Sequence, residues 1–182
     1  MAESFRRIVT GFNSKGKSVI VKDTRMPSGL FGGAEFWRTH CSPAALGANA
    51  DADQGPARLE PPPGGTLFRF FEIPPQDKAA SSEAIEKRAA ELFASVGASH
   101  CRVDTRRHWL MHTTKTIDYV LLLRGEITLF MDEGEVDLHP FDAVIQRGTN
   151  HSWINRGKEP ALLMAVLVDA GAGVPPSGGK TG

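Results

Sequence analysis

Two histidines and one carboxylate in the C-terminal half are the residues of this chain best suited to chemistry. His112 and Asp118 bracket the segment His112-Thr113-Thr114-Lys115-Thr116-Ile117-Asp118, and His151 closes the segment Gly148-Thr149-Asn150-His151. Imidazole and carboxylate groups bind transition metals and transfer protons near neutral pH. The residues between these segments are mostly strand-like. A site built from them therefore depends on how the strands are arranged.

A run of short strands is predicted around these residues. The strand-like segments are 108–112, 119–123, 127–131, 136–138, 143–146, 152–155 and 162–168. An acidic turn at residues 132–135 is typical of a hairpin. Many short antiparallel strands predict an all-β sandwich or barrel. Alternate residues of a strand share a face, so His108, Leu110, His112 and Thr114 are expected to point the same way.

The first 65 residues are predicted to be a strand extension and a flexible loop rich in Pro and Gly. Residues 7–10 and 18–22 read as a hairpin, and residues 34–39 as a further strand. Residues 42–65 have no apolar period and end in Pro-Pro-Pro-Gly-Gly, which predicts a long exposed loop. The barrel is expected at 66–170, beginning with a strand at 66–73, and 171–182 is expected to be a disordered tail.

One helix is predicted at about residues 82–96. Ser81 or Ser82 can cap its start, and Gly97 is placed to end it. Its apolar face combines Ile85, Ala89, Leu92 and Val96. This face is expected to pack on the outside of the barrel. The alternative is a mobile lid over the mouth of the barrel.

The overall composition excludes several classes of function. The 182 residues contain 21 Lys plus Arg and 21 Asp plus Glu, so no net field attracts nucleic acid or a membrane surface. No apolar run of 18 residues is present, and no secretory apolar core follows the N-terminus. Cys41 and Cys101 have no metal-type spacing. We therefore expect a cytoplasmic protein without a nucleic-acid or membrane partner.

The two motif segments resemble those of the cupin superfamily. The first cupin motif is His-x-His, three or four residues, Glu, six residues, Gly. The second is Pro-x-Gly-x-x-His-x-x-x-Asn. The anchor positions of the first motif are held here by His112, Thr114, Asp118 and Gly125, and those of the second by Gln146, Gly148, His151 and Asn155. The spacing is kept throughout, whereas Thr114, Asp118 and Gln146 differ from the family in residue type. The resemblance covers residues 109–168.

The resemblance implies a double-stranded β-helix, or jelly-roll barrel, with a metal site inside it. It places His112, Asp118 and His151 around one point, which is the ligand set of a facial triad. Fe, Mn, Ni, Cu or Zn could bind there. Thr114 is a poor replacement for an imidazole ligand and leaves one more open position. Asp118 is one methylene shorter than Glu, so it is expected to reach the metal directly, through water, or to act as a general base instead.

The pocket and the reaction follow from the same resemblance. Asp118 and His108 are the candidate catalytic residues. His108 is also the kind of histidine that simply hydrogen-bonds in a core. The expected pocket residues are Thr114, Leu110, Val120, Leu122, Gln146 and Trp153. The segment at Gln146 is similar to small stand-alone cupins linked to aromatic and polyketide pathways.

The sequence leaves three functions open. They are a metal-dependent oxidoreductase, dehydratase or isomerase acting on an aromatic or polyketide-like small molecule, a non-catalytic sensor, and a degenerate barrel used for interaction. A homodimer is expected by analogy, with exposed N-terminal strands pairing across a two-fold axis.

Overall fold

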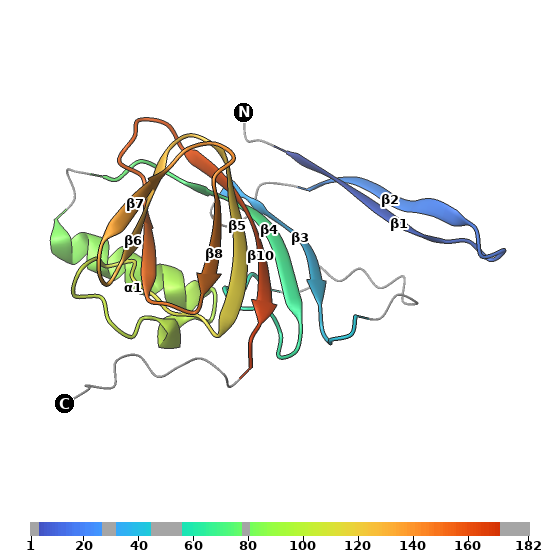
Figure 1. The fold of residues 1–182 in the computed structure, drawn as a ribbon, viewed down its shortest axis with the longest axis horizontal. Coiled ribbons are helices and arrows are strands. Elements are labelled where there is room, and N and C mark those ends of the chain that lie inside the picture. Colours follow the sequence, from blue (N-terminus) through green and yellow to red (C-terminus); the bar gives the residue numbers. More distant parts are fainter. Residues whose placement is uncertain (1–3, 27–31, 45–55, 78–80, 172–182) are drawn as a thin grey trace.

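The computed structural model describes residues 4–26, 32–44, 56–77 and 81–171 (Figure 1). Within them the strands are β1 (Phe5–Phe12), β2 (Ser18–Met26), β3 (Ala34–Thr39), β4 (Thr66–Ile73), β5 (Thr116–Arg124), β6 (Ile127–Met131), β7 (Glu135–Leu138), β8 (Ala143–Arg147), β9 (His151–Ile154) and β10 (Ala161–Asp169). The helices are α1 (Ser82–Ser95) and the short 3₁₀ helix η2 (Ser99–Cys101). Residues 45–55 of the predicted loop and the predicted tail from 172 lie outside the described residues. No helix in the described ranges is long and apolar enough to cross a membrane.

Two antiparallel sheets form the barrel. One has the strand order β3-β4-β10-β5-β8, and the other has the order β7-β6-β9. Their facing side chains form one apolar core, which consists of Leu67, Val120, Leu122, Ile127, Leu129, Leu138, Trp153, Ala161, Leu163, Ala165 and Leu167. Alternation along β5 buries Val120 and Leu122 and turns Tyr119 outward, as expected for a strand with one core face. The all-β jelly-roll prediction is therefore confirmed.

The N-terminal hairpin extends away from this barrel, on the side opposite α1 (Figure 1). Only its base is anchored. The Phe5 ring stacks on Phe70, with 5.2 Å between ring centroids, and a guanidinium N–H of Arg7 donates to the Phe36 carbonyl at 3.2 Å. The predicted hairpin is confirmed. Most of its length has no barrel surface beneath it.

A bulge interrupts the pairing of β3 with β4. Glu35 pairs with Arg69, and Trp37 pairs with Phe68, so Phe36 is the extra residue. Because of this extra residue, Glu35 and Arg38 face the same side of the sheet, and an Arg38 guanidinium nitrogen lies 2.6 Å from a Glu35 carboxylate oxygen. Residues 34–39, assigned from the sequence to the N-terminal extension, are thus an edge strand of the barrel sheet.

The helix α1 forms as the sequence predicted. The Ser81 hydroxyl accepts a hydrogen bond from the Ala84 N–H, and Gly97 ends the helix at φ +67°. The buried face includes Ala89 and Phe93. Phe93 was not among the predicted apolar residues of this helix. It packs in a second apolar cluster with Val96, Ala98 and Cys101.

Residues 108–112 are not a strand, so that prediction is wrong. The Met111 N–H donates to the His108 carbonyl at 3.0 Å and makes a turn, and only His112 forms an isolated bridge. The alternating apolar pattern suggested a strand, but a turn can also place apolar residues at every second position. Tyr119 is exposed, since it lies on the outer face of β5.

Candidate functional site

His112 and His151 are brought together by one backbone bridge. The His112 N–H donates to the His151 carbonyl at 2.9 Å, and the His151 N–H donates to the His112 carbonyl at 3.0 Å. The two ring centroids lie 4.3 Å apart. On the other side of His112 the Phe93 ring of α1 makes an edge contact at 5.1 Å between centroids. The helix therefore packs directly against the histidine pair.

Both imidazoles are held in the same tautomer. His112 Nδ1 lies 2.9 Å from the Leu110 carbonyl oxygen, and His151 Nδ1 lies 2.9 Å from the Thr149 carbonyl oxygen. A carbonyl can only accept, so each Nδ1 carries the proton and each Nε2 keeps its lone pair. No described residue hydrogen-bonds to either Nε2. This arrangement is usual for histidines that bind a metal.

Burial keeps the histidine pair neutral. Loss of water lowers the pKa of His151 to about 3, and the neighbouring His112 adds to this effect. Loss of water also lowers the pKa of His112, against the opposing hydrogen bond to Leu110. A neutral imidazole is the form that binds a divalent metal, so the pair is ready to bind one without first losing protons.

Asp118 lies on the inner face of β5, between Leu167 of β10 and Gln146 of β8. Its side chain is buried, and Oδ1 has no hydrogen-bond partner among the described residues. Burial raises the pKa of Asp118 to about 6, despite the opposing effects of the Thr116 hydroxyl and the Arg69 guanidinium. A carboxyl group with this pKa can take up and release a proton near neutral pH.

The structure does not bring the three predicted ligands together as tightly as a metal site needs. Among the described residues, only Glu60, His100 and Cys101 form a set of three such donors with all ligand atoms within 4.8 Å of one another. The adjacent imidazoles of His112 and His151 remain the two candidate ligands, each with an Nε2 that has no described partner. The unpaired Asp118 Oδ1 suits a role through water or as a proton acceptor better than direct ligation. The metal assignment stays a prediction.

His108 is held on both ring nitrogens. Nδ1 lies 2.9 Å from Ser152 Oγ and accepts the Leu110 N–H at 3.3 Å, while Nε2 lies 3.4 Å from the Gln76 side-chain amide. Burial lowers the pKa of His108 to about 4. These contacts favour the structural role that the sequence left open beside the catalytic one.

The predicted pocket residues fall into three groups. Val120, Leu122 and Trp153 pack in the apolar core of the barrel. The Thr114 hydroxyl is 2.6 Å from that of Thr116, and the Gln146 amide donates to the Thr149 carbonyl at 3.1 Å. Leu110 packs instead against the cluster beside α1. This follows from the turn at 108–112, which breaks the expected strand parity.

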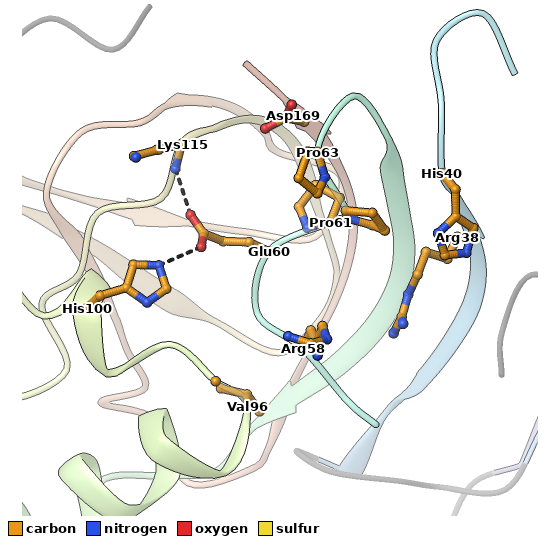
Figure 2. A pocket seen from close by; sticks show the side chains of 12 residues that line it. Arg38, His40, Arg58, Glu60, Pro61, Pro63, Val96, His100, Lys115 and Asp169 are labelled. Carbon is orange, nitrogen blue, oxygen red and sulfur yellow. Dashed lines mark hydrogen bonds and ion pairs between the residues drawn. The ribbon is translucent and has the colours of Figure 1, made fainter. Parts of the chain in front are cut away.

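A cleft of about 470 Å³ lies between the described loop residues 56–63, the end of α1 and the edge of β3 (Figure 2). Glu60 projects into it between two partners. One carboxylate oxygen lies 2.8 Å from His100 Nε2, and the other accepts the Lys115 N–H at 3.0 Å. The thiol of Cys101 lies 3.5 Å from the same His100 nitrogen. Burial and the nearby Glu60 carboxylate raise the pKa of the Cys101 thiol to about 12.

The cleft carries several cationic groups. Arg38, Arg58 and Lys115 line it, and the buried Arg38 Nε has no hydrogen-bond partner within the described part of the chain. Arg69 donates to the Arg58 and Leu59 carbonyls and so holds the loop in place. Burial lowers the pKa of Arg69 to about 10, against the effect of Glu35. Glu60 and Asp169 also line it, so the cleft carries charges of both signs.

Glu60, His100 and Cys101 were not predicted as functional residues from the sequence. His100 and Cys101 are adjacent, but nothing in the sequence indicates that Glu60, on a Pro-rich loop, meets them. An adjacent His-Cys pair was the available signal.

Comparison with protein families agrees with the motif spacing. Residues 102–167 match the cupin domain. The chain thus contains a cupin domain over these residues, and the matched segment includes both motif segments.

Its relatives include proteins from fungal biosynthesis clusters. Phomopsin biosynthesis cluster protein C' of Diaporthe leptostromiformis is 29% identical over 163 residues, which cover 82% of this chain and 70% of the relative. The cupin-domain-containing oxidoreductase srdD of Neurospora crassa is 36% identical over 63 residues, about a third (32%) of each chain. A Cupin 2 conserved barrel domain protein from Salinispora arenicola has 15% identity and a TM-score of 0.37, covering 58% of this chain and 64% of that one.

Proposed function

We propose that the barrel is the site of a metal-dependent enzyme acting on a small aromatic or polyketide-like compound. The observation that carries the proposal is the pair of neutral histidines whose Nδ1 protons are fixed on carbonyls, leaving both Nε2 lone pairs without a described partner. A bound divalent transition metal would act as a Lewis acid toward a substrate oxygen. The likeness to cupin-domain-containing oxidoreductases supports redox chemistry, and dehydration or isomerisation is the alternative within the same site.

The residues of the chain have separate roles in this proposal. Asp118 takes up or releases the substrate proton, because its pKa is about 6 and Oδ1 is unpaired among the described residues. Phe93 and Trp153 contact the histidine pair from two sides and keep bulk water from the imidazoles.

Metal content tests the proposal. Wild-type protein grown with transition metals is expected to retain close to one equivalent at the histidine pair by inductively coupled plasma mass spectrometry. Replacing both His112 and His151 with Ala removes both Nε2 donors, so that equivalent should be lost. His139→Ala, at an exposed histidine, is the matched control. Equal metal in wild type and the double variant would contradict the proposal and favour a sensor without a metal.

We also propose that the partner of the N-terminal hairpin is a second copy of this chain. Ile8, Phe12, Val19, Ile20 and Val21 are exposed on β1 and β2. A two-stranded hairpin in water is marginally stable, and an open strand edge invites pairing. A second hairpin related by a two-fold axis would cover both the apolar side chains and an edge.

Light scattering after size-exclusion chromatography tests this dimer. Wild type is expected at about twice the chain mass of 19.7 kDa. Ile20→Lys together with Phe12→Lys should shift it to the mass of one chain. Val136→Lys, at an exposed apolar residue of β7, should leave it dimeric. A monomeric wild type rules out the proposed partner.

A further inference from the structure

We infer that Glu60, His100 and Cys101 form a second metal site, separate from the histidine pair and selective for Zn²⁺. The three side chains offer a carboxylate, an imidazole and a thiol, with their ligand atoms within 4.8 Å of one another. A thiolate is a poor ligand for Mg²⁺ or Ca²⁺, whereas this donor mixture suits zinc.

The distances approach those of a tetrahedral zinc site. Zinc bonds of about 2.3 Å to sulfur and about 2.0 Å to nitrogen place the two ligands about 3.5 Å apart at a tetrahedral angle. Cys101 Sγ and His100 Nε2 are 3.5 Å apart. The Glu60 oxygen is 2.8 Å from His100 Nε2, which is a hydrogen-bond distance. Zinc would replace the shared proton, and this pair would open by roughly 0.6 Å.

The surrounding contacts hold two of the ligands in place. The Lys115 N–H donates to the second Glu60 oxygen, and the Leu59 N–H donates to the Val96 carbonyl at 3.3 Å. Cys101 is fixed by its own N–H, which donates to the Ala98 carbonyl at 2.9 Å. Ligands oriented by such outer hydrogen bonds lose less freedom when the metal binds.

Solvent access and the number of protein ligands are also consistent with a zinc site. The His100 side chain is exposed, and both His100 and Glu60 line the cleft. Ions can therefore enter from solvent. Three protein ligands leave the fourth position of a tetrahedral zinc open toward the cleft. A site of this kind binds water or an acidic small molecule at that position.

Cobalt substitution and zinc titration test the inference. The parent protein carries Cys41→Ser, which removes the exposed thiol, and His112→Ala with His151→Ala, which removes the histidine pair. After chelator treatment it is expected to bind one equivalent of Zn²⁺ in competition with a chromophoric chelator. Co²⁺ should produce the near-ultraviolet charge-transfer band of a thiolate ligand.

Three further variants separate the outcomes. Cys101→Ser should abolish the cobalt–thiolate band and weaken zinc binding at least about tenfold, and Glu60→Gln should weaken it by about tenfold or more while keeping the band. His139→Gln, at an exposed histidine, should change neither. Circular dichroism checks that each variant is folded. A parent without the band, or a Cys101→Ser variant that binds zinc as the parent does, overturns the inference. Either result leaves the metal content of the His112–His151 pair as an independent question.

Discussion

The metal-free protein is expected to lose stability steeply as the pH falls from 6.5 toward 4, because its buried histidines must be protonated. The folded pKa of His151 is about 3, and that of His108 is about 4, both below the ordinary value of 6.5. The unfolded chain therefore binds more protons than the folded chain in this range. The stabilising contribution is complete above pH 6.5 and is lost as the pH falls through the folded pKa values. For His151 alone the full contribution reaches about 5 kcal/mol.

Urea unfolding between pH 4 and 8, in the presence of a chelator, measures this effect. His151→Asn is expected to be less stable at pH 7, since it disturbs the core, but to depend far less on pH below 6.5. His139→Asn, at an exposed site, should keep the wild-type slope. A His151→Asn variant with an unchanged slope would show that His151 does not remain neutral in the fold.

Asp118→Asn is expected to stabilise the metal-free protein at pH 7.5. Burial raises the folded pKa of Asp118 from 3.8 to about 6, so the folded chain binds more protons than the unfolded chain between these values. The favourable contribution is complete below pH 3.8 and is lost as the pH rises through 6. The charged carboxylate thus costs up to about 3 kcal/mol at pH 7.5. This figure already includes the attraction to Arg69; burial of the Asn amide reduces the gain, and we expect about 2 kcal/mol.

The stability that Asp118→Asn gains over wild type should shrink as the pH is lowered, when the two proteins are compared at each pH. Asp104→Asn provides a control of opposite sign, because Arg106 lowers the pKa of Asp104 to about 2. That variant should be destabilised at neutral pH. A gain for Asp118→Asn that is the same at pH 4.5 and 7.5 would falsify the assignment of a raised pKa. If Asp118 moves the substrate proton, the more stable variant is also the less active one, as is common where a site holds a buried charge.

Local patterns were enough to predict most of the barrel. The strand at 66–73 and the hairpin turn before Glu135 were placed correctly from alternation and turn residues. The meeting of His112 and His151 followed from family spacing rather than from physics, because the bridge between them is isolated. The turn at His108 was missed because the hydrogen bonds that form it, from the Met111 N–H to the His108 carbonyl and from the Leu110 N–H to His108 Nδ1, leave the apolar alternation unchanged.

The cluster of Glu60, His100 and Cys101 could not be predicted from the sequence, because it depends on long-range contacts. Glu60 reaches His100 and Cys101 because Arg69 and the end of α1 hold its loop. Neither contact has a local signature in the sequence. The burial of Asp118 was likewise predicted only through the family motif, and this burial raises its pKa against the lowering effects of Thr116 and Arg69.

The bulge at Phe36 means that strand pairing, as well as residue identity, determines which charged side chains face the cleft. Side chains three residues apart in a regular strand face opposite ways, yet Glu35 and Arg38 share a face. If this strand paired regularly over the same residues, without the bulge, Glu35 and Arg38 would face opposite ways; deletion of Phe36 itself would keep them on one face, two residues apart. Two descendants of this barrel could thus keep every functional side chain and still differ in ligand preference, because one forms the bulge and the other pairs regularly.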